Sequence, residues 1–108
     1  MGLSISITEV RDGRKVADFG IWSKHYGLFD FIRGLVNERP TGKKIGPGDA
    51  IATYLTRAEI ARWRKALNGR EYETSGRWGE DFTGDDMAAI RDAAKIMREG
   101  GKVFFWAA

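Results

Sequence analysis

The sequence predicts an α+β domain with a small, mostly antiparallel sheet covered by two or three helices. Alternating apolar residues near both ends of the chain indicate strands, and two segments in its second half begin with helix-capping signals. A loop rich in glycine separates these halves. The length of 108 residues fits one domain spanning residues 1–108. The expected order is strand, strand, helix, strand, helix, helix, strand, with one more strand between the last two helices if residues 71–75 pair.

The first two strands are expected to form an N-terminal hairpin. Apolar residues alternate with polar ones over residues 3–8 and again over 17–21, on either side of Arg11-Asp12-Gly13. A three-residue loop with Gly13 in the left-handed conformation would pair Val10 with Arg14 and place the apolar side chains on one face. The pairs expected on that face are Ile7 with Ala17, Ile5 with Phe19, and Leu3 with Ile21.

The first helix is expected to begin after Ser23, a candidate N-cap, and to run to about Glu38. Pro40 then prevents its continuation. Its expected buried stripe consists of Leu28, Phe31, Ile32 and Leu35. Residues 41–48 read as a loop because of their glycines and proline, and residues 50–55 as a short middle strand.

Two further helices begin with similar signals. Thr56-Arg57-Ala58-Glu59 is a capping box and opens a helix that ends near Asn68-Gly69. Thr83 followed by Asp86 repeats the pattern after an irregular segment, residues 70–82, and Gly100-Gly101 ends that helix. Residues 102–107 form the expected C-terminal strand. The expected inward stripe of the last helix consists of Met87, Ile90, Ala94 and Met97.

The composition excludes several kinds of chemistry. There is no cysteine, which excludes disulfides, thiol catalysis and cysteine–zinc sites. His25 is the only histidine, and its place at the edge of a buried stripe predicts a structural role rather than a catalytic one. Glu80, Asp81, Asp85 and Asp86 are close together but lack the spacing of a calcium-binding loop. We therefore expect no metal and no cofactor.

Positive charge is concentrated in the middle of the chain. The net charge is +3, yet residues 39–70 carry eight basic and only two acidic side chains. Such a segment can contact nucleic-acid phosphates, contact an acidic protein surface, or simply face solvent. The candidate residues for contact with nucleic acid or an acidic partner are Lys43, Lys44, Arg57, Arg62, Arg64, Lys65 and Arg70.

Trp78 stands apart from the periodic segments. It follows Arg77 in the glycine-flanked stretch Ser75-Gly76-Arg77-Trp78-Gly79 and belongs to no apolar stripe. Tryptophan and arginine dominate the binding energy of many protein interfaces. Arg77 and Trp78 are therefore the candidate partner-binding residues, and the alternative is that Trp78 folds back as a lid on the sheet.

The chain resembles a group of small uncharacterised phage and bacterial proteins. The shared features are an opening Met-Gly-Leu, a Trp–Lys pair before an amphipathic helix, and a closing aromatic strand. Their counterparts in this sequence are Met1-Gly2-Leu3, Ile21-Trp22-Ser23-Lys24, Tyr54-Leu55-Thr56-Arg57-Ala58-Glu59-Ile60 and Val103-Phe104-Phe105-Trp106. The resemblance implies a phage or mobile-element origin and carries no activity with it.

These patterns favour a small binding protein over an enzyme. No nucleophile–base pair and no metal set is visible in the sequence. No apolar run is long enough to span a membrane, so we expect a cytoplasmic protein that does not enter one. The expected function is docking on another protein, as an inhibitor or adaptor. The alternatives are a nucleic-acid-binding module that uses the basic helix 56–69, and a small enzyme of undefined class.

Overall fold

Four antiparallel strands form one open sheet in the computed structural model, which describes residues 2–108; Met1 of the opening Met-Gly-Leu lies outside them. The strand order is β2-β1-β4-β3. The bounds are β1 Ser4–Arg11, β2 Arg14–Ser23, β3 Ile51–Leu55 and β4 Lys102–Ala107. The predicted α+β class, with its N-terminal hairpin, middle strand and C-terminal strand, is confirmed.

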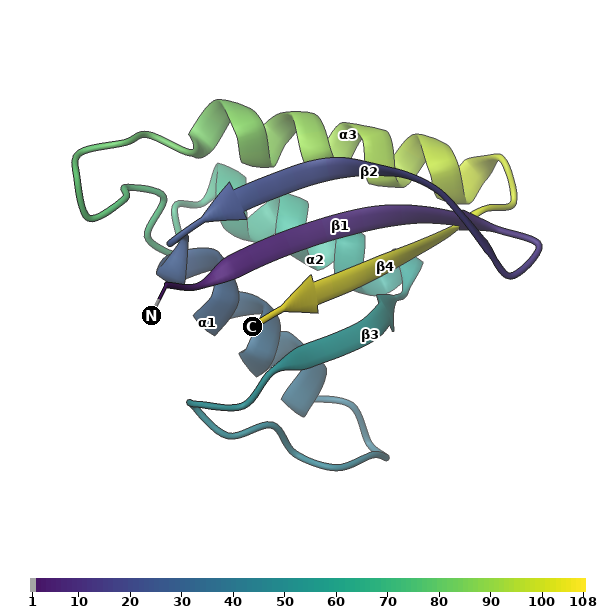
Figure 1. Cartoon of the computed structure of the whole chain (residues 1–108), viewed down its shortest axis with the longest axis horizontal. Coiled ribbons are helices and arrows are strands. Elements are labelled where there is room, and N and C mark those ends of the chain that lie inside the picture. Colours follow the sequence, from purple (N-terminus) through teal and green to yellow (C-terminus); the bar gives the residue numbers. More distant parts are fainter. Residues whose placement is uncertain (1) are drawn as a thin grey trace.

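Three helices cover one face of the sheet and leave the other face open (Figure 1). They are α1 Tyr26–Asn37, α2 Arg57–Asn68 and α3 Thr83–Arg98. The core lies between the two layers, because each strand turns every second side chain towards the helices. The fully buried side chains include Ile7 and Phe105 from the sheet and Ile32 and Trp63 from the helices. Within the described residues, no helix is long and apolar enough to cross a membrane.

The predicted hairpin register is wrong, because the turn has two residues instead of the expected three. Arg11 pairs with Arg14, and the turn between them has two residues, Asp12 and Gly13, with φ of 54° and 75°. An Asp-Gly turn of this kind matches the natural twist of paired strands. The pairing of β1 with β2 then shifts register twice, between Glu9 and Val10 and between Ile7 and Thr8. These shifts change which side chains of β2 face the helices. The resulting pairs are Ile5 with Trp22 and Ile7 with Gly20, so Trp22 is buried and Ile21 is exposed.

Two of the three helix starts also differ from expectation. The capping box at Thr56 is confirmed, with hydrogen bonds in both directions between Thr56 and Glu59. Helix α1, however, is capped by His25 rather than Ser23, because the His25 ring accepts the backbone N–H of Leu28. Helix α3 has no side-chain cap, and its predicted capping partner Asp86 points into the core.

The inward position of Asp86 sets the rotation of α3 about its axis. The buried stripe starts at Asp86 and continues at successive helical spacings of about three or four residues. It consists of Asp86, Ala89, Ile90, Ala93 and Ile96. The predicted stripe therefore shares only Ile90 with the fully buried set. Met87 is 53% exposed. Apolar periodicity alone does not show this, because it assigns no buried position to an aspartate, which is expected here as a capping residue.

Helix α1 contains two glycines in contrasting surroundings. A Cβ on Gly27 would lie 1.9 Å from the backbone oxygen of Glu73, in the segment between α2 and α3, whereas a Cβ on Gly34 would meet open space. Close approach of this segment to α1 therefore requires the absence of a side chain at residue 27.

We predict opposite effects of alanine at these two positions. Gly34→Ala should stabilise the protein by about 0.5–1 kcal/mol, because alanine is the better helix former. Gly27→Ala should destabilise it by about 1–3 kcal/mol, because the new methyl group collides with a backbone carbonyl. Urea unfolding of both variants measures the difference. Equal effects of the two changes would mean that residues 71–75 do not pack on α1.

Candidate functional site

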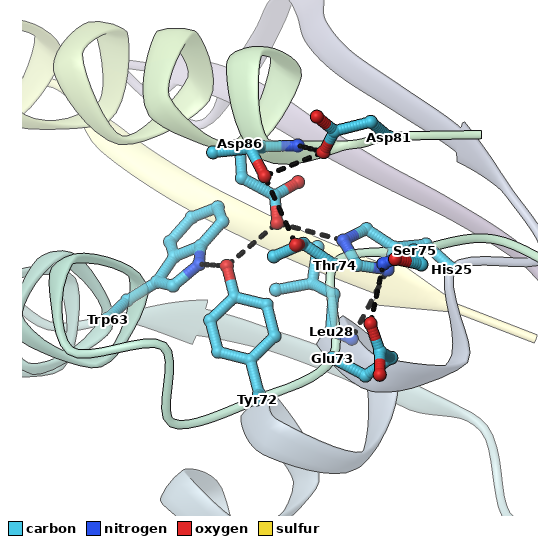
Figure 2. Close-up of polar contacts among 10 residues, drawn as sticks. His25, Leu28, Trp63, Tyr72, Glu73, Thr74, Ser75, Asp81 and Asp86 are labelled. Carbon is cyan, nitrogen blue, oxygen red and sulfur yellow. Dashed lines mark hydrogen bonds and ion pairs between the residues drawn. The ribbon is translucent and has the colours of Figure 1, made fainter. Parts of the chain in front are cut away.

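A chain of buried hydrogen bonds links all three helices to the segment between α2 and α3 (Figure 2). At its centre, Oδ2 of Asp86 lies 2.8 Å from Nε2 of His25 and 2.7 Å from the hydroxyl oxygen of Tyr72. Nε1 of Trp63 in turn donates to that hydroxyl oxygen at 2.8 Å. His25, Asp86 and Trp63 are completely inaccessible to solvent.

These contacts define the role of each group. Nδ1 of His25 accepts the N–H of Leu28, so the ring proton lies on Nε2 and is donated to Asp86. Asp86 also accepts the hydroxyl hydrogen of Tyr72. Both ring nitrogens of His25 thus have hydrogen-bond partners. The Phe82 ring stacks on the imidazole, with 4.4 Å between the two ring centroids. The predicted structural role of His25 is supported, with complete rather than partial burial.

Burial raises the pKa of the Tyr72 hydroxyl, and the neighbouring negative charge of Asp86 raises it further. The phenol therefore stays neutral in the folded protein well above the pH at which a free tyrosine ionises. A neutral hydroxyl can serve as donor to Asp86 and acceptor from Trp63 at once.

The segment after Tyr72 forms a compact loop, residues 74–83, on top of this chain. At its base, Phe82 donates its backbone N–H to Thr74, and the Thr83 hydroxyl lies 3.1 Å from that of Thr74. Ser75 and Asp81 form a β-bridge above that base. Asp81 also accepts the backbone N–H of Thr83 at 3.0 Å. Both ends of the loop are therefore held by hydrogen bonds.

The tip of the loop carries the exposed Trp78. Two backbone hydrogen bonds close the tip, from Gly76 to Glu80 and from Gly79 to Gly76. The backbone N–H of Trp78 donates to Oε1 of Glu80 at 2.8 Å. The Trp78 side chain is 75% exposed, the highest value among the large exposed apolar residues. Trp78 is therefore not a lid on the sheet, and Arg77 beside it is exposed as well.

An open, polar cleft of about 750 Å³ lies between this loop and the end of α2. Carboxylates line much of it, and local hydrogen bonds determine their ionisation. Hydrogen bonds from Ser75 lower the pKa of Glu73, those from Thr83 lower the pKa of Asp81, and one from Arg62 lowers the pKa of Glu71. The lining residues include Arg70, Glu71, Glu73, Glu80 and Asp81. The cleft is thus predominantly negative at neutral pH.

The acidic cluster noted in the sequence does not form one site. Asp86 is buried beneath the loop, Asp81 and Glu80 accept backbone N–H groups, and Asp85 is exposed in the first turn of α3. Across residues 2–108, no three His, Asp or Glu side chains gather in a way that could hold a metal ion.

The predicted basic residues are divided among several surfaces. Arg62 bonds to Glu71, just after α2, at 2.7 Å, and its guanidinium lies over the ring of Phe31 in α1. Lys44 donates to the backbone carbonyls of Asn37, at the end of α1, and Arg39, which leaves it less available to a partner. Arg57 and Arg64 face α3 instead. The remaining candidates are exposed, Lys43 in the loop before β3 and Lys65 and Arg70 around the end of α2.

Sequence reasoning missed a second exposed aromatic surface, on the open face of the sheet. Cross-strand pairing places Trp106 beside Ala52 and Phe104 beside Tyr54. Trp106 is 40% exposed and Tyr54 is 44% exposed. Alternation in β4 contained the signal, because Val103 and Phe105 occupy the inward positions and so turn Trp106 outward.

Comparisons with protein families, with curated proteins and with solved structures found no match to this chain. The assignment of a function therefore depends on the chemistry and geometry of the site alone.

The buried hydrogen-bond chain can be tested with two neighbouring aspartates. Asp86→Ala leaves the His25 ring N–H and the Tyr72 hydroxyl without their acceptor, so unfolding should be easier by about 3 kcal/mol or more. Asp85→Ala removes an exposed charge from the same helical turn and should cost no more than about 1 kcal/mol. Urea unfolding of the two variants should separate them clearly, and similar losses would contradict this role for Asp86.

Tyr72→Phe should cost about 1–3 kcal/mol at neutral pH, because it leaves the buried Trp63 N–H unpaired. The stabilisation linked to the raised pKa of Tyr72 is complete below about pH 10 and decreases above it, since only the unfolded chain ionises there. The stability difference between wild type and variant should therefore narrow in alkaline solution. Unfolding measured across that range checks this, and a constant or widening difference would contradict it.

Proposed function

We propose that the protein is a non-enzymatic binding protein, of the inhibitor or adaptor type, that docks on another protein through Trp78 and Arg77. The observation that carries this proposal is the exposure of the Trp78 side chain, at 75%, on a loop closed by its own hydrogen bonds. An indole held in water is unfavourable until a partner covers it.

The rigidity of the loop supports the proposal. A flexible loop loses conformational freedom on binding, and this loss reduces affinity. Here the loop is already ordered by the contacts between Thr74 and Phe82, between Ser75 and Asp81, and at the tip. Its base is also joined to the buried chain around Asp86. The Trp78 side chain is therefore presented in advance, as in a preorganised binding loop.

The state of the single histidine argues against catalysis. His25 is fully buried, and both of its ring nitrogens have partners within the fold. A general base must reach a substrate proton directly or through one water molecule. The strongest candidate base in the sequence is thus committed to holding the structure together.

We predict that Trp78→Ala weakens binding to the partner by about 2 kcal/mol or more, mainly through faster dissociation. The partner is first captured from the native host with the wild-type protein and identified by mass spectrometry. Binding kinetics of the purified pair then compare wild type with Trp78→Ala and Trp78→Phe. Trp78→Phe should retain part of the affinity, because it keeps an aromatic ring at the anchor position.

Trp106→Ala is the matched control, since it removes the same side chain from the open face of the sheet. Each variant is first checked for folding by circular dichroism. Loss of binding only with Trp106→Ala would show that the interface lies on the open face of the sheet, and it would contradict the proposal. Capture of nucleic acid that Trp78→Ala does not affect would favour the alternative based on the basic helix.

A further inference from the structure

Helices α2 and α3 run antiparallel (Figure 1). Side chains of both helices line a groove between them. The beginning of α2 lies beside the end of α3, where Nη2 of Arg57 donates to the carbonyl oxygen of Met97 at 2.9 Å. The groove has a volume of about 170 Å³. It lies on the helical layer, so it is separate from the open face of the sheet.

The chemistry of the groove is divided between its edges and its floor. Three arginines, Arg57, Arg64 and Arg98, line it from both helices. The rest of the lining is apolar, with two small and two larger side chains, and consists of Ile60, Ala61, Ala94 and Met97. The sequence had indicated the two arginines of α2 as part of a basic helix, but not their convergence with Arg98 from α3.

The arginines of the groove are not neutralised within the fold. Among residues 2–108, neither Arg64 nor Arg98 forms an ion pair, whereas Arg39 and Arg62 are each paired with a glutamate. Arg57 bonds to a backbone carbonyl and keeps its full charge. Gathering like charges around one groove is unfavourable by itself, and carboxylates from a partner would relieve that repulsion.

We propose that this groove binds an acidic peptide segment of a protein partner. Carboxylates of the segment would pair with Arg57, Arg64 and Arg98, and one apolar side chain would cover the floor around Ala61. This inference rests on the proposed function in one respect, that the partner is a protein. A nucleic-acid backbone would satisfy the arginines but offers no apolar group to the floor, so a peptide matches the groove better.

The test uses a fluorescently labelled synthetic peptide made of glutamate, aspartate and alanine with leucines at helical spacing. It is titrated with the protein, residues 1–108. Binding should weaken as salt is added, because charge pairing contributes to it. Arg64→Glu combined with Arg98→Glu should reduce affinity at least about tenfold. Ala61→Phe fills the floor without changing charge and should reduce affinity by a similar factor.

The control double variant, Lys43→Glu with Lys102→Glu, makes the same change in net charge at the 41–50 loop and on the sheet. It should alter affinity by less than about threefold, since only long-range attraction changes. A peptide in which lysine replaces the acidic residues should not bind. Circular dichroism confirms that each variant is folded.

Three outcomes would overturn the inference. The acidic peptide could fail to bind below about 1 mM, the control double variant could weaken peptide binding as much as the groove variants do, or Ala61→Phe could leave the affinity unchanged.

Labelled duplex DNA is titrated in parallel. DNA binding that is lost with Arg64→Glu and Arg98→Glu, but not with Ala61→Phe, would assign the groove to nucleic acid. Trp78→Ala should not affect peptide binding, so failure here is distinguishable from failure of the Trp78 interface.

Discussion

The rest of the structure depends on the buried carboxylate of Asp86. Through its contacts with His25 and Tyr72, it joins the start of α1, the start of α3 and the segment after α2. Burying a carboxylate is unfavourable unless hydrogen bonds replace its lost hydration, and here two donors meet one of its oxygens. Because Asp86 must face inward, it sets the rotation of α3, and that rotation decides which residues of α3 are buried.

The same interaction lies between the core and the exposed loop that carries Trp78. The loop carrying Trp78 rises directly from Tyr72 and returns at Phe82, which stacks on His25. Rigid polar contacts at the base allow the tip to hold an exposed indole without collapsing onto the sheet. Exposure of a large apolar side chain is thus confined to the tip of the loop, while its base is held by the fold.

Arginines serve two different purposes in this protein. Arg39 donates to Glu59 and to the backbone of β3, and so fixes the chain after α1 against the start of α2. Burial alone would raise the pKa of Glu59, but the hydrogen bonds from Arg39 and Thr56 outweigh it and lower that pKa. Arg64 and Arg98 have no such internal partner and lie beside an apolar groove. Composition alone cannot distinguish these two groups, because it counts every arginine equally.

The sequence by itself determined the α+β class, the element order, the capping box at Thr56 and the residues of the loop that carries Trp78. Each of these follows from local patterns: alternation, capping spacing and glycine-rich turns. Tertiary structure alone decided the hairpin register, the cap at His25, the inward turn of Asp86 and the meeting of Arg64 with Arg98. These features depend on groups far apart in the chain, and a buried polar side chain is stable only where distant donors meet it.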